Sequence, residues 1–245
     1  LPDMGLQMSE MLRDGKIVQL PRLPAGSFSH VQTLRLGWLD APVEQVRGFI
    51  SAFSGTRTLE ITSNGFTELP IAPGALPELT RLDLHNNHIA VTTAVQNQFN
   101  GLLNLEYLNL GNNPLGNLDV SALTRLKALN LRGTTLQAWP TGAEKLPKLS
   151  WLDLRDNELS SLSQEALSDE DALMKTQLTG NEFSTTGAAA LEAARRRIEA
   201  AKGLPEGTLE RFAQEAVPAQ FPPTETGWSI ASHLLSLPER TPVTP

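Results

Sequence analysis

Few residues in this chain have the chemistry of a catalytic or metal centre. Asp83, His85 and His88 are the one group with metal-ligand chemistry, but His88 lies beyond the expected turn, so a solvated polar sheet is favoured over a metal site. The chain has no cysteine, which excludes disulfides, thiolate nucleophiles and zinc sites built on Cys. Nucleotide-binding loops, H-E-x-x-H, EF-hand spacing and G-x-S-x-G are also absent. The sequence therefore predicts no enzyme activity, no cofactor and no metal.

A second set of residues has the chemistry of protein recognition. Tyr, Trp, Arg and acidic residues recur between leucines, and such residues are typical of protein-binding hot spots. In a strand, alternate residues face opposite sides, so these side chains would lie opposite the leucines. We predict a contact patch for a protein partner formed by Arg81, Asp83, His85, Tyr107, Asn109, Arg132, Trp151, Asp153 and Arg155. The alternative is that Tyr107 and Trp151 only cover neighbouring backbone.

An internal repeat supplies the elements that would position this patch. Leucine accounts for 41 of the 245 residues, and the pattern L-x-x-L-x-L-x-x-N-x-L recurs seven times. The clearest copies lie at 76–89, 102–115, 123–136 and 146–159, and weaker copies at 30–41, 55–66 and 173–183. On these residues the chain resembles the leucine-rich repeat family. The resemblance implies an α/β fold, a right-handed leucine-rich-repeat solenoid with a curved parallel sheet on its concave face and mixed helices and turns on its convex face.

One asparagine per repeat has a structural interpretation. A buried Asn amide at the turn after the strand can pair with backbone N–H and C=O groups that the bend leaves free. The predicted structural ladder consists of Asn64, Asn87, Asn113, Asn157 and Asn181. Thr134 can replace part of this function with its hydroxyl, whereas Leu39 cannot, which marks the first repeat as irregular.

The segments outside the strands divide the chain. Helical spacing predicts a convex helix at 43–53 and a weaker one at 91–103, while the short step from Asn113 to Thr134 favours a turn or a 3₁₀ piece. We expect an N-terminal cap at 1–29, about seven repeats at 30–183, a helical C-terminal cap at 184–217, and a Pro/Thr-rich linker with a short helix at 218–245. Trp139 is expected to plug the core edge. Three arginines at 195–197 favour a solvated cap surface over a phosphate site.

Charge and composition limit the partners. The net charge of −7 argues against nucleic acid or an anionic membrane, because both recruit an excess of Lys and Arg. No apolar run is long enough to span a membrane, and residues 1–20 lack the features of a signal peptide. The absence of cysteine departs from disulfide-stabilised ectodomains of the family. We therefore expect a cytoplasmic protein, or one that a bacterium secretes into a host cell.

The exit from the last repeat into helices also resembles the recognition segment of bacterial IpaH-like effector ubiquitin ligases, and related large multidomain proteins of pseudomonads. That resemblance implies a fragment of a longer protein that selects a protein partner, including a host protein, while a cysteine elsewhere performs the transfer. The alternative is a structural or autoinhibitory spacer that packs against the rest of its own chain. The sequence does not predict the oligomeric state.

Overall fold

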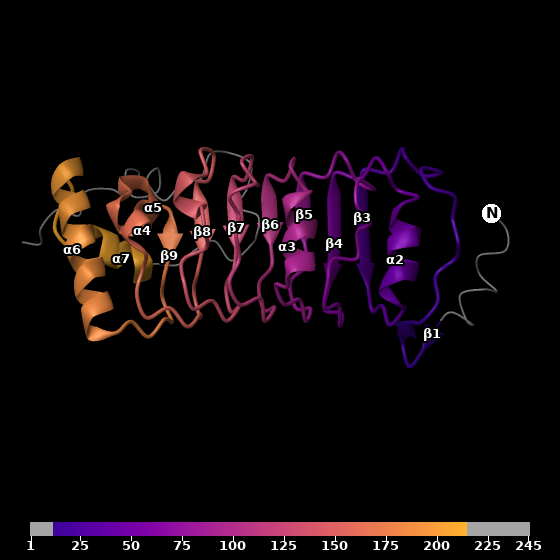
Figure 1. The fold of residues 1–245 in the computed structure, drawn as a ribbon, viewed down its shortest axis with the longest axis horizontal. Coiled ribbons are helices and arrows are strands. Elements are labelled where there is room, and N and C mark those ends of the chain that lie inside the picture. The colour runs from indigo at the N-terminus through magenta and orange to yellow at the C-terminus, as the bar shows by residue number, and fades with distance from the viewer. Residues whose placement is uncertain (1–11, 215–245) are drawn as a thin grey trace, which may run out of the picture.

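The leucine repeat produces one short strand per turn of a solenoid. The structure is a computed structural model in which residues 12–214 are described (Figure 1). Seven strands form one parallel sheet in sequence order: β3 (Thr33–Gly37), β4 (Thr58–Thr62), β5 (Arg81–Asp83), β6 (Tyr107–Asn109), β7 (Ala128–Asn130), β8 (Trp151–Asp153) and β9 (Thr176–Gln177). Equivalent positions pair directly, so that Leu82 pairs with Leu108, and Leu129 with Leu152. The strands are thus stacked in the register that the sequence repeat predicts.

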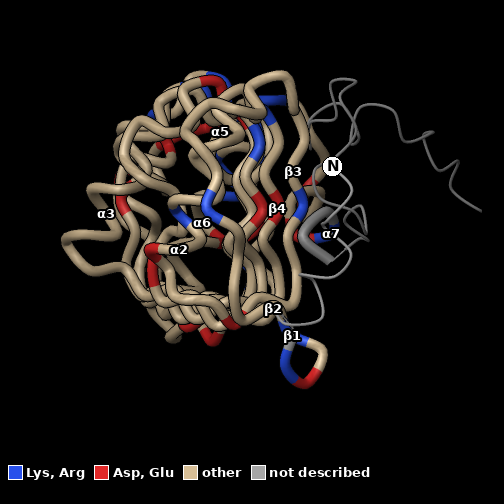
Figure 2. Tube along the Cα trace, turned by 90° about the vertical axis from the view of Figure 1, so that its right-hand side faces the viewer, with Lys and Arg blue, Asp and Glu red and all other residues tan. Residues whose placement is uncertain are grey.

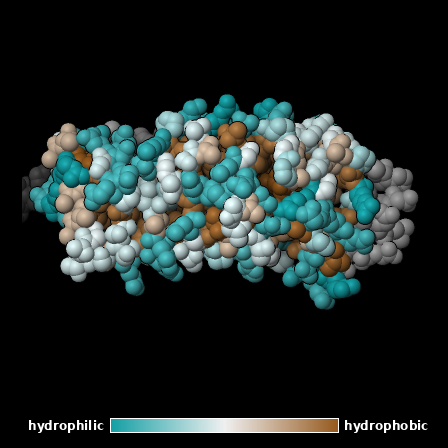
Figure 3. Space-filling model, viewed as in Figure 1, coloured by the Kyte–Doolittle hydropathy of each residue, from teal (hydrophilic) through white to brown (hydrophobic). Residues whose placement is uncertain are grey.

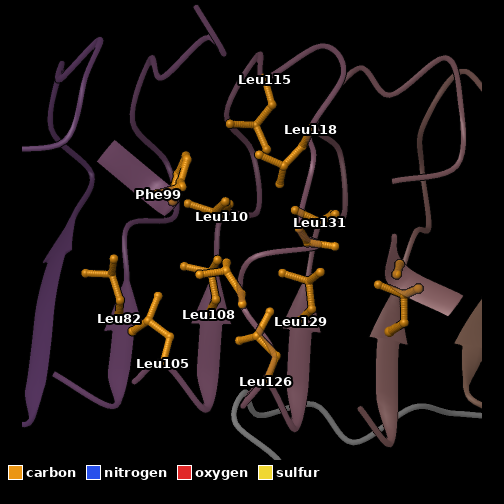
Figure 4. Close-up of a cluster of buried hydrophobic side chains, with 14 of the residues drawn as sticks. Leu82, Phe99, Leu105, Leu108, Leu110, Leu115, Leu118, Leu126, Leu129 and Leu131 are labelled. Atoms are coloured by element: carbon orange, nitrogen blue, oxygen red, sulfur yellow. The ribbon is translucent and has the colours of Figure 1, made fainter. Parts of the chain in front are cut away.

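The core is a stack of leucines from successive repeats. Leu82, Leu108 and Leu129 are fully buried, and Figure 4 shows them side by side on successive strands, with Leu105 and Leu126 from the segments that precede the strands. Such burial stabilises the fold by about 25 cal/mol per Å² of apolar surface removed from water. Since each leucine packs mainly on its neighbours in adjacent repeats, no repeat is stable alone.

The convex side is uneven. Helix α2 (Val43–Ile50) buries Val46 and Ile50, and α3 (Thr93–Asn100) begins where the Thr92 hydroxyl accepts the amide of Val95. Two short helices, α4 (Gln164–Ser168) and α5 (Glu170–Met174), and a 3₁₀ turn at Ala143–Lys145 cover later repeats. The helices predicted near 43–53 and 91–103 are confirmed, whereas α4 and α5 were not predicted. Between 114 and 127 the chain forms turns without a helix, as the short repeat there predicts.

Buried asparagines connect consecutive turns. In Asn113, for example, the amide nitrogen donates to the carbonyls of Leu84 and Leu110, and Oδ1 accepts the amide of Ile89. Asn64, Asn87, Asn157 and Asn181 also donate to backbone carbonyls, within their own repeat or the preceding one. Each of these side chains satisfies polar backbone that would otherwise be buried without a partner.

Both ends of the solenoid are followed by elements that do not belong to the repeat. At the N-terminal end, β1 (Leu12–Arg13) and β2 (Lys16–Ile17) form a hairpin. The segment after this hairpin runs beside the end of α2, where the amide of Phe28 donates to the carbonyl of Ala52. At the other end, α6 (Thr185–Lys202) starts at Ser184, whose hydroxyl accepts the amide of Gly187. The helix predicted at 184–202 is therefore confirmed. Residues 1–11 of the expected N-terminal cap lie outside the described residues.

A short helix, α7 (Thr208–Gln214), follows α6. The buried carboxylate of Glu199 accepts the amides of Gly207 and Leu209 at its start, and Leu209 joins the core. Figure 2 looks along the solenoid and places α7 on the same side as β3 and β4, opposite α2 and α3. The last residues of the expected cap and the linker with its short helix at 218–245 lie outside the described residues.

The helix-bearing side of the surface carries no broad apolar patch, because hydrophilic and hydrophobic residues are interspersed there (Figure 3).

Trp139 is buried in the core and its indole N–H donates to Glu144 at 3.0 Å, so the predicted plug is confirmed. Among the described residues, no helix has the length and apolar character needed to cross a membrane.

Candidate functional site: the concave face of the sheet

The concave face consists of the strand side chains that point away from the leucines. Its central column is Arg35, Glu60, Asp83, Asn109, Asn130, Asp153 and Gln177, which the strand pairing places side by side. Both signs of charge occur along the strands (Figure 2). We call the positions on β3 to β6 the N-terminal half of this face and those on β7 to β9 the C-terminal half. The two halves differ in exposure.

The N-terminal half presents charged and aromatic groups that hold one another. Arg35 Nε lies 2.7 Å from Glu60 Oε2 on the neighbouring strand, and both side chains are in contact with solvent. The guanidinium of Arg81 lies 4.6 Å from the ring centroid of Tyr107, a cation–π contact across β5 and β6. Both residues are half-buried. This half therefore offers an accessible aromatic group whose position is fixed by a cation.

His85 is the ionisable group of this half with a shifted pKa. Its Nδ1 lies 2.5 Å from Asp83 Oδ1, and this hydrogen bond raises the pKa of His85 above its usual value of 6.5, although burial opposes the shift. The charges of Asp83 and Glu60 act in the same direction as the hydrogen bond. His88 is exposed and is not part of this arrangement. Within residues 12–214, no group of three or more His, Asp or Glu residues is arranged to hold a metal ion.

The central column also has a structural function that the sequence analysis missed. Asp83, Asn109, Asn130 and Asp153 each accept, through Oδ1, the backbone N–H two residues later. This arrangement is an Asx turn, which fixes the backbone as it leaves the strand. The signal was present, because an Asp or Asn ends four consecutive strands. Part of the hydrogen-bonding capacity of these residues is therefore used within the fold.

In the C-terminal half, the outward residues of β8 and β9 are buried, contrary to the expectation for Trp151 and Asp153. Trp151 lies on the predicted side of β8, but it is only 3% exposed, and Asp153 is fully buried. Asn109 at the border of the N-terminal half is also buried. The exposure expected of these three predicted contact residues is wrong, whereas the strand register is as predicted. The period of the sequence determines the direction of a side chain and leaves open what packs over it.

Buried polar groups characterise this half. Arg155 donates to both carboxylate oxygens of Asp153, with the shortest contact at 2.7 Å, and the pairing raises the pKa of Arg155. Burial lowers the pKa of Lys175, which lies two residues before Gln177 in the chain. The amide of Gln177 is 0% exposed and has no hydrogen-bond partner among the described residues. Polar burial of this kind costs free energy.

The remaining predicted residues lie at the edge of the face. Arg132 is exposed, and its Nε donates to Asp156 of the next repeat at 2.6 Å. The three arginines of α6 were predicted to form a solvated surface. Arg196 pairs with Glu192 and Glu206, and Arg197 donates to the carbonyl of Leu167. Burial lowers the pKa of Arg195. These partners leave no convergent group of free cations for a phosphate at 195–197.

One leucine-rich strand and one ladder residue per turn define a leucine-rich repeat solenoid. Comparison with known families agrees: a model described as Leucine rich repeat matches residues 124–183, and a second Leucine Rich Repeat model matches residues 104–126. Residues 104–183 thus match leucine-rich repeat models, in agreement with the predicted family, and the predicted fold class is confirmed. No finding here supports the resemblance to effector ubiquitin ligases, which stays a prediction.

This chain matches each of the following curated relatives over only part of that relative's length. Transforming growth factor beta activator LRRC33 of Danio rerio is 31% identical over 139 residues, covering 55% of this chain and 19% of its own. Tubulin-specific chaperone E of Danio rerio is 31% identical over 154 residues, covering 58% of this chain and 29% of its own length. Nephrocan of Mus musculus is 34% identical over 140 residues, covering 55% of this chain and 26% of its own length. The chain therefore spans less than a third of the length of these relatives.

Solved structures share the fold. A leucine-rich repeat protein of Leptospira interrogans has a TM-score of 0.58 at 22% identity, covering 76% of this chain and 52% of its own. Internalin C2 of Listeria monocytogenes has a TM-score of 0.51 at 26% identity, covering 69% of each chain. Human 5T4, a trophoblast glycoprotein, has a TM-score of 0.57 at 22% identity, covering 74% of each. Solenoids of this family are typically binding scaffolds rather than enzymes.

Proposed function

We propose that this chain is a protein-binding module that contacts its partner through the N-terminal half of the concave face. The observation that carries the proposal is the half-exposed pair of Arg81 and Tyr107, with the cation 4.6 Å from the ring centroid. A side chain that is already ordered loses little entropy when a partner covers it. Asp83 and His85, two and four residues after Arg81, add polar groups that give a partner its orientation.

The scaffold supports this use of the surface. Successive strands hold their outward residues at fixed separations, so a wide partner can meet several repeats at once. Of the predicted contact residues, Arg81, Asp83, His85, Tyr107 and Arg132 are at least partly accessible, and Arg155 is partly accessible beside Asp153. Trp151 and Asp153 would reach a partner only after rearrangement. We assign to binding the accessible residues of the N-terminal half, Arg81, Asp83, His85 and Tyr107.

We further propose that the module is the partner-recognition segment of a larger protein. Its matches to longer relatives are consistent with a module inside a multidomain chain. A bacterial effector ubiquitin ligase, acting in the cytoplasm or inside a host cell, is the specific form of this hypothesis. The sequence of the complete gene tests that form. A helical domain with one reactive cysteine after the repeats supports it, and its absence refutes the ligase hypothesis while leaving the binding module in place.

Affinity capture with the purified chain tests the binding surface. Extracts would be compared by quantitative mass spectrometry between the parent chain, the double variant Arg81→Ser/Tyr107→Ala, and Glu165→Ala on the convex side as a matched control. Captured proteins are then tested with purified components. We expect at least one direct partner whose affinity falls about ten-fold or more in the double variant and is unchanged in the control. Equal affinity for all three chains would reject this surface.

A second candidate function has its own supporting observation. Trp151, Asp153, Lys175 and Gln177 are buried in the chain without any partner molecule. We propose that the C-terminal half of the concave face is packed in cis, as a structural or autoinhibitory spacer would require. The two functions are compatible, because they use different halves of the face.

The absence of cysteine makes a direct test of this packing possible. Single-cysteine variants Glu60→Cys and Gln177→Cys place a thiol in each half, and a thiol-specific reagent measures its accessibility. We expect Gln177→Cys to react at least about a hundred-fold more slowly than Glu60→Cys, because the opening of buried structure limits its rate. Addition of urea should remove the difference. Similar rates under native conditions would show that the C-terminal half is open.

A further inference from the structure

The turn that follows β3 contains an exposed tryptophan. Trp38 is 69% exposed, and of the described large apolar side chains only Leu103, at 57%, is comparably exposed. This turn follows β3, the first strand of the seven-stranded sheet, which lies toward the N-terminal end of the solenoid (Figure 1). A single exposed tryptophan needs no explanation by itself. Its backbone conformation supplies a second observation.

Trp38 has a left-handed backbone, with φ of 57°. The same position of every later repeat also has positive φ, and it is occupied by Ser63, Asn86, Asn112, Gly133, Asp156 and Gly180. Gly, Asn and Asp tolerate this conformation, whereas a bulky aromatic residue is an outlier there. Trp38 therefore carries backbone strain without gaining the burial that stabilises other aromatic residues. Strain held at an exposed position indicates a functional use.

The surrounding backbone is held in place by hydrogen bonds. The carbonyl of Trp38 accepts the amide of Ile17 at 2.6 Å, and the amide of Asp40 donates to Ile17 at 2.8 Å. Asn64 accepts the amide of Leu39 at 2.8 Å from the next repeat. The turn is therefore fixed on both sides, and Trp38 is presented from a rigid base.

A shallow depression begins at the residue after Trp38. Its apolar part comes from Leu39, Val43 and Phe66, and its acidic part from Asp40 and Glu68. The volume is about 190 Å³, below the range of roughly 300–1,000 Å³ that is usual for small-molecule sites. Such a depression suits one apolar side chain of a polypeptide rather than a separate ligand.

The charges favour a basic partner. Glu68 is paired with Arg47 at 3.0 Å, whereas Asp40 is exposed and forms no ion pair within residues 12–214. A Lys or Arg side chain could pair with Asp40 and stack on the indole of Trp38. Carboxylates at this position oppose the approach of a phosphate backbone.

We infer that Trp38, Asp40 and the depression lined by Leu39 and Phe66 form a docking site for a polypeptide segment that presents a Lys or Arg beside an apolar side chain. The site is separate from the Arg81–Tyr107 surface. A partner could use either one alone, so the two proposals fail independently.

Selection from a random short-peptide library tests this inference. The purified parent chain is the bait, and affinities of selected peptides are measured by fluorescence anisotropy. The test variant is Trp38→Asn, which matches Asn86 and Asn112 in the equivalent turns and should therefore fold with a melting temperature equal to or above that of the parent. Asp40→Asn removes only the charge. Leu103→Ala is the control for loss of an exposed apolar side chain.

We expect selected peptides to share a basic residue beside an apolar one. Their affinity should fall at least about ten-fold in Trp38→Asn, fall less in Asp40→Asn, and stay unchanged in Leu103→Ala. An empty selection, peptides without a basic residue, or binding that survives Trp38→Asn would overturn the inference. Sedimentation velocity provides a further outcome: a dimer that Trp38→Asn abolishes would assign the site to a second copy of this chain instead.

Discussion

The two halves of the concave face come from the same repeat and behave differently. In the N-terminal half, Arg35 and Glu60 form a solvent-exposed pair, and in the C-terminal half, Asp153 and Arg155 form a pair whose carboxylate is buried. Tyr107 and Trp151 occupy equivalent columns, yet Tyr107 is half-exposed and Trp151 is buried. The comparison teaches that the repeat fixes the direction of a side chain, while its role depends on whether other parts of the chain pack over it. Three predictions test this difference, beginning with the largest effect.

Replacement of the aromatic residues should separate the halves most clearly. We expect Trp151→Ala to lower the free energy of unfolding by about 3 kcal/mol or more, because it leaves a cavity in buried structure. Tyr107→Ala should cost about 1 kcal/mol, since the ring is half-exposed and mainly loses its contact with Arg81. Urea unfolding followed by circular dichroism measures both values. Equal losses would mean that Trp151 is no more buried in solution than Tyr107.

The ion pairs should differ by a smaller amount. Double-mutant cycles with Asp153→Asn and Arg155→Gln should give a coupling of about 2 kcal/mol, because the Asp153 carboxylate is buried and accepts several N–H bonds. The equivalent cycle with Arg35→Gln and Glu60→Gln should give less than about 1 kcal/mol, as is usual for exposed pairs. Added salt should weaken only the second coupling. A salt-sensitive coupling at Asp153 would contradict the assignment.

The titration of His85 should show the smallest effect. Its folded pKa is raised above 6.5 by the hydrogen bond with Asp83, so its contribution to stability is fully present below pH 6.5 and is lost as the pH rises through the folded value. NMR titration of the imidazole, assigned with His85→Gln, measures this pKa. Asp83→Asn keeps an oxygen acceptor but removes the charge, so the pKa should fall. An unchanged pKa in Asp83→Asn would show that the carboxylate is not the cause.

Local periodicity was sufficient to predict most of the architecture. The alternation around Leu82 and Leu84 predicted the buried face of a strand, and the helical spacing from Val43 to Ile50 predicted α2. Ser184 followed by an Ala-rich run predicted α6. These predictions succeeded because each depends on contacts within a repeat or between adjacent repeats.

The parts that were not predicted depend on more distant contacts or on turn chemistry. Burial of Trp151 depends on what packs over the outward side of β8, and periodicity carries no information about that packing. The Asx turns at Asp83 and Asn109 do not follow from the leucine period, because a polar residue between leucines fits a solvated surface equally well. The strained turn at Trp38 could be detected only from its backbone angle.

The direction of the asparagine hydrogen bonds has a consequence for unfolding. Asn113, Asn157 and Asn181 each donate to a carbonyl of the preceding repeat, so every one of these bonds points toward the N-terminus. If the last coil peels away, the carbonyl of Leu154 in the coil before it keeps only the bond donated by Asn157, and the amide of Leu159 loses Asn181 Oδ1 as its acceptor. Fraying is thereby penalised at each step, and the ladder makes the solenoid melt more cooperatively than stacked leucines alone would.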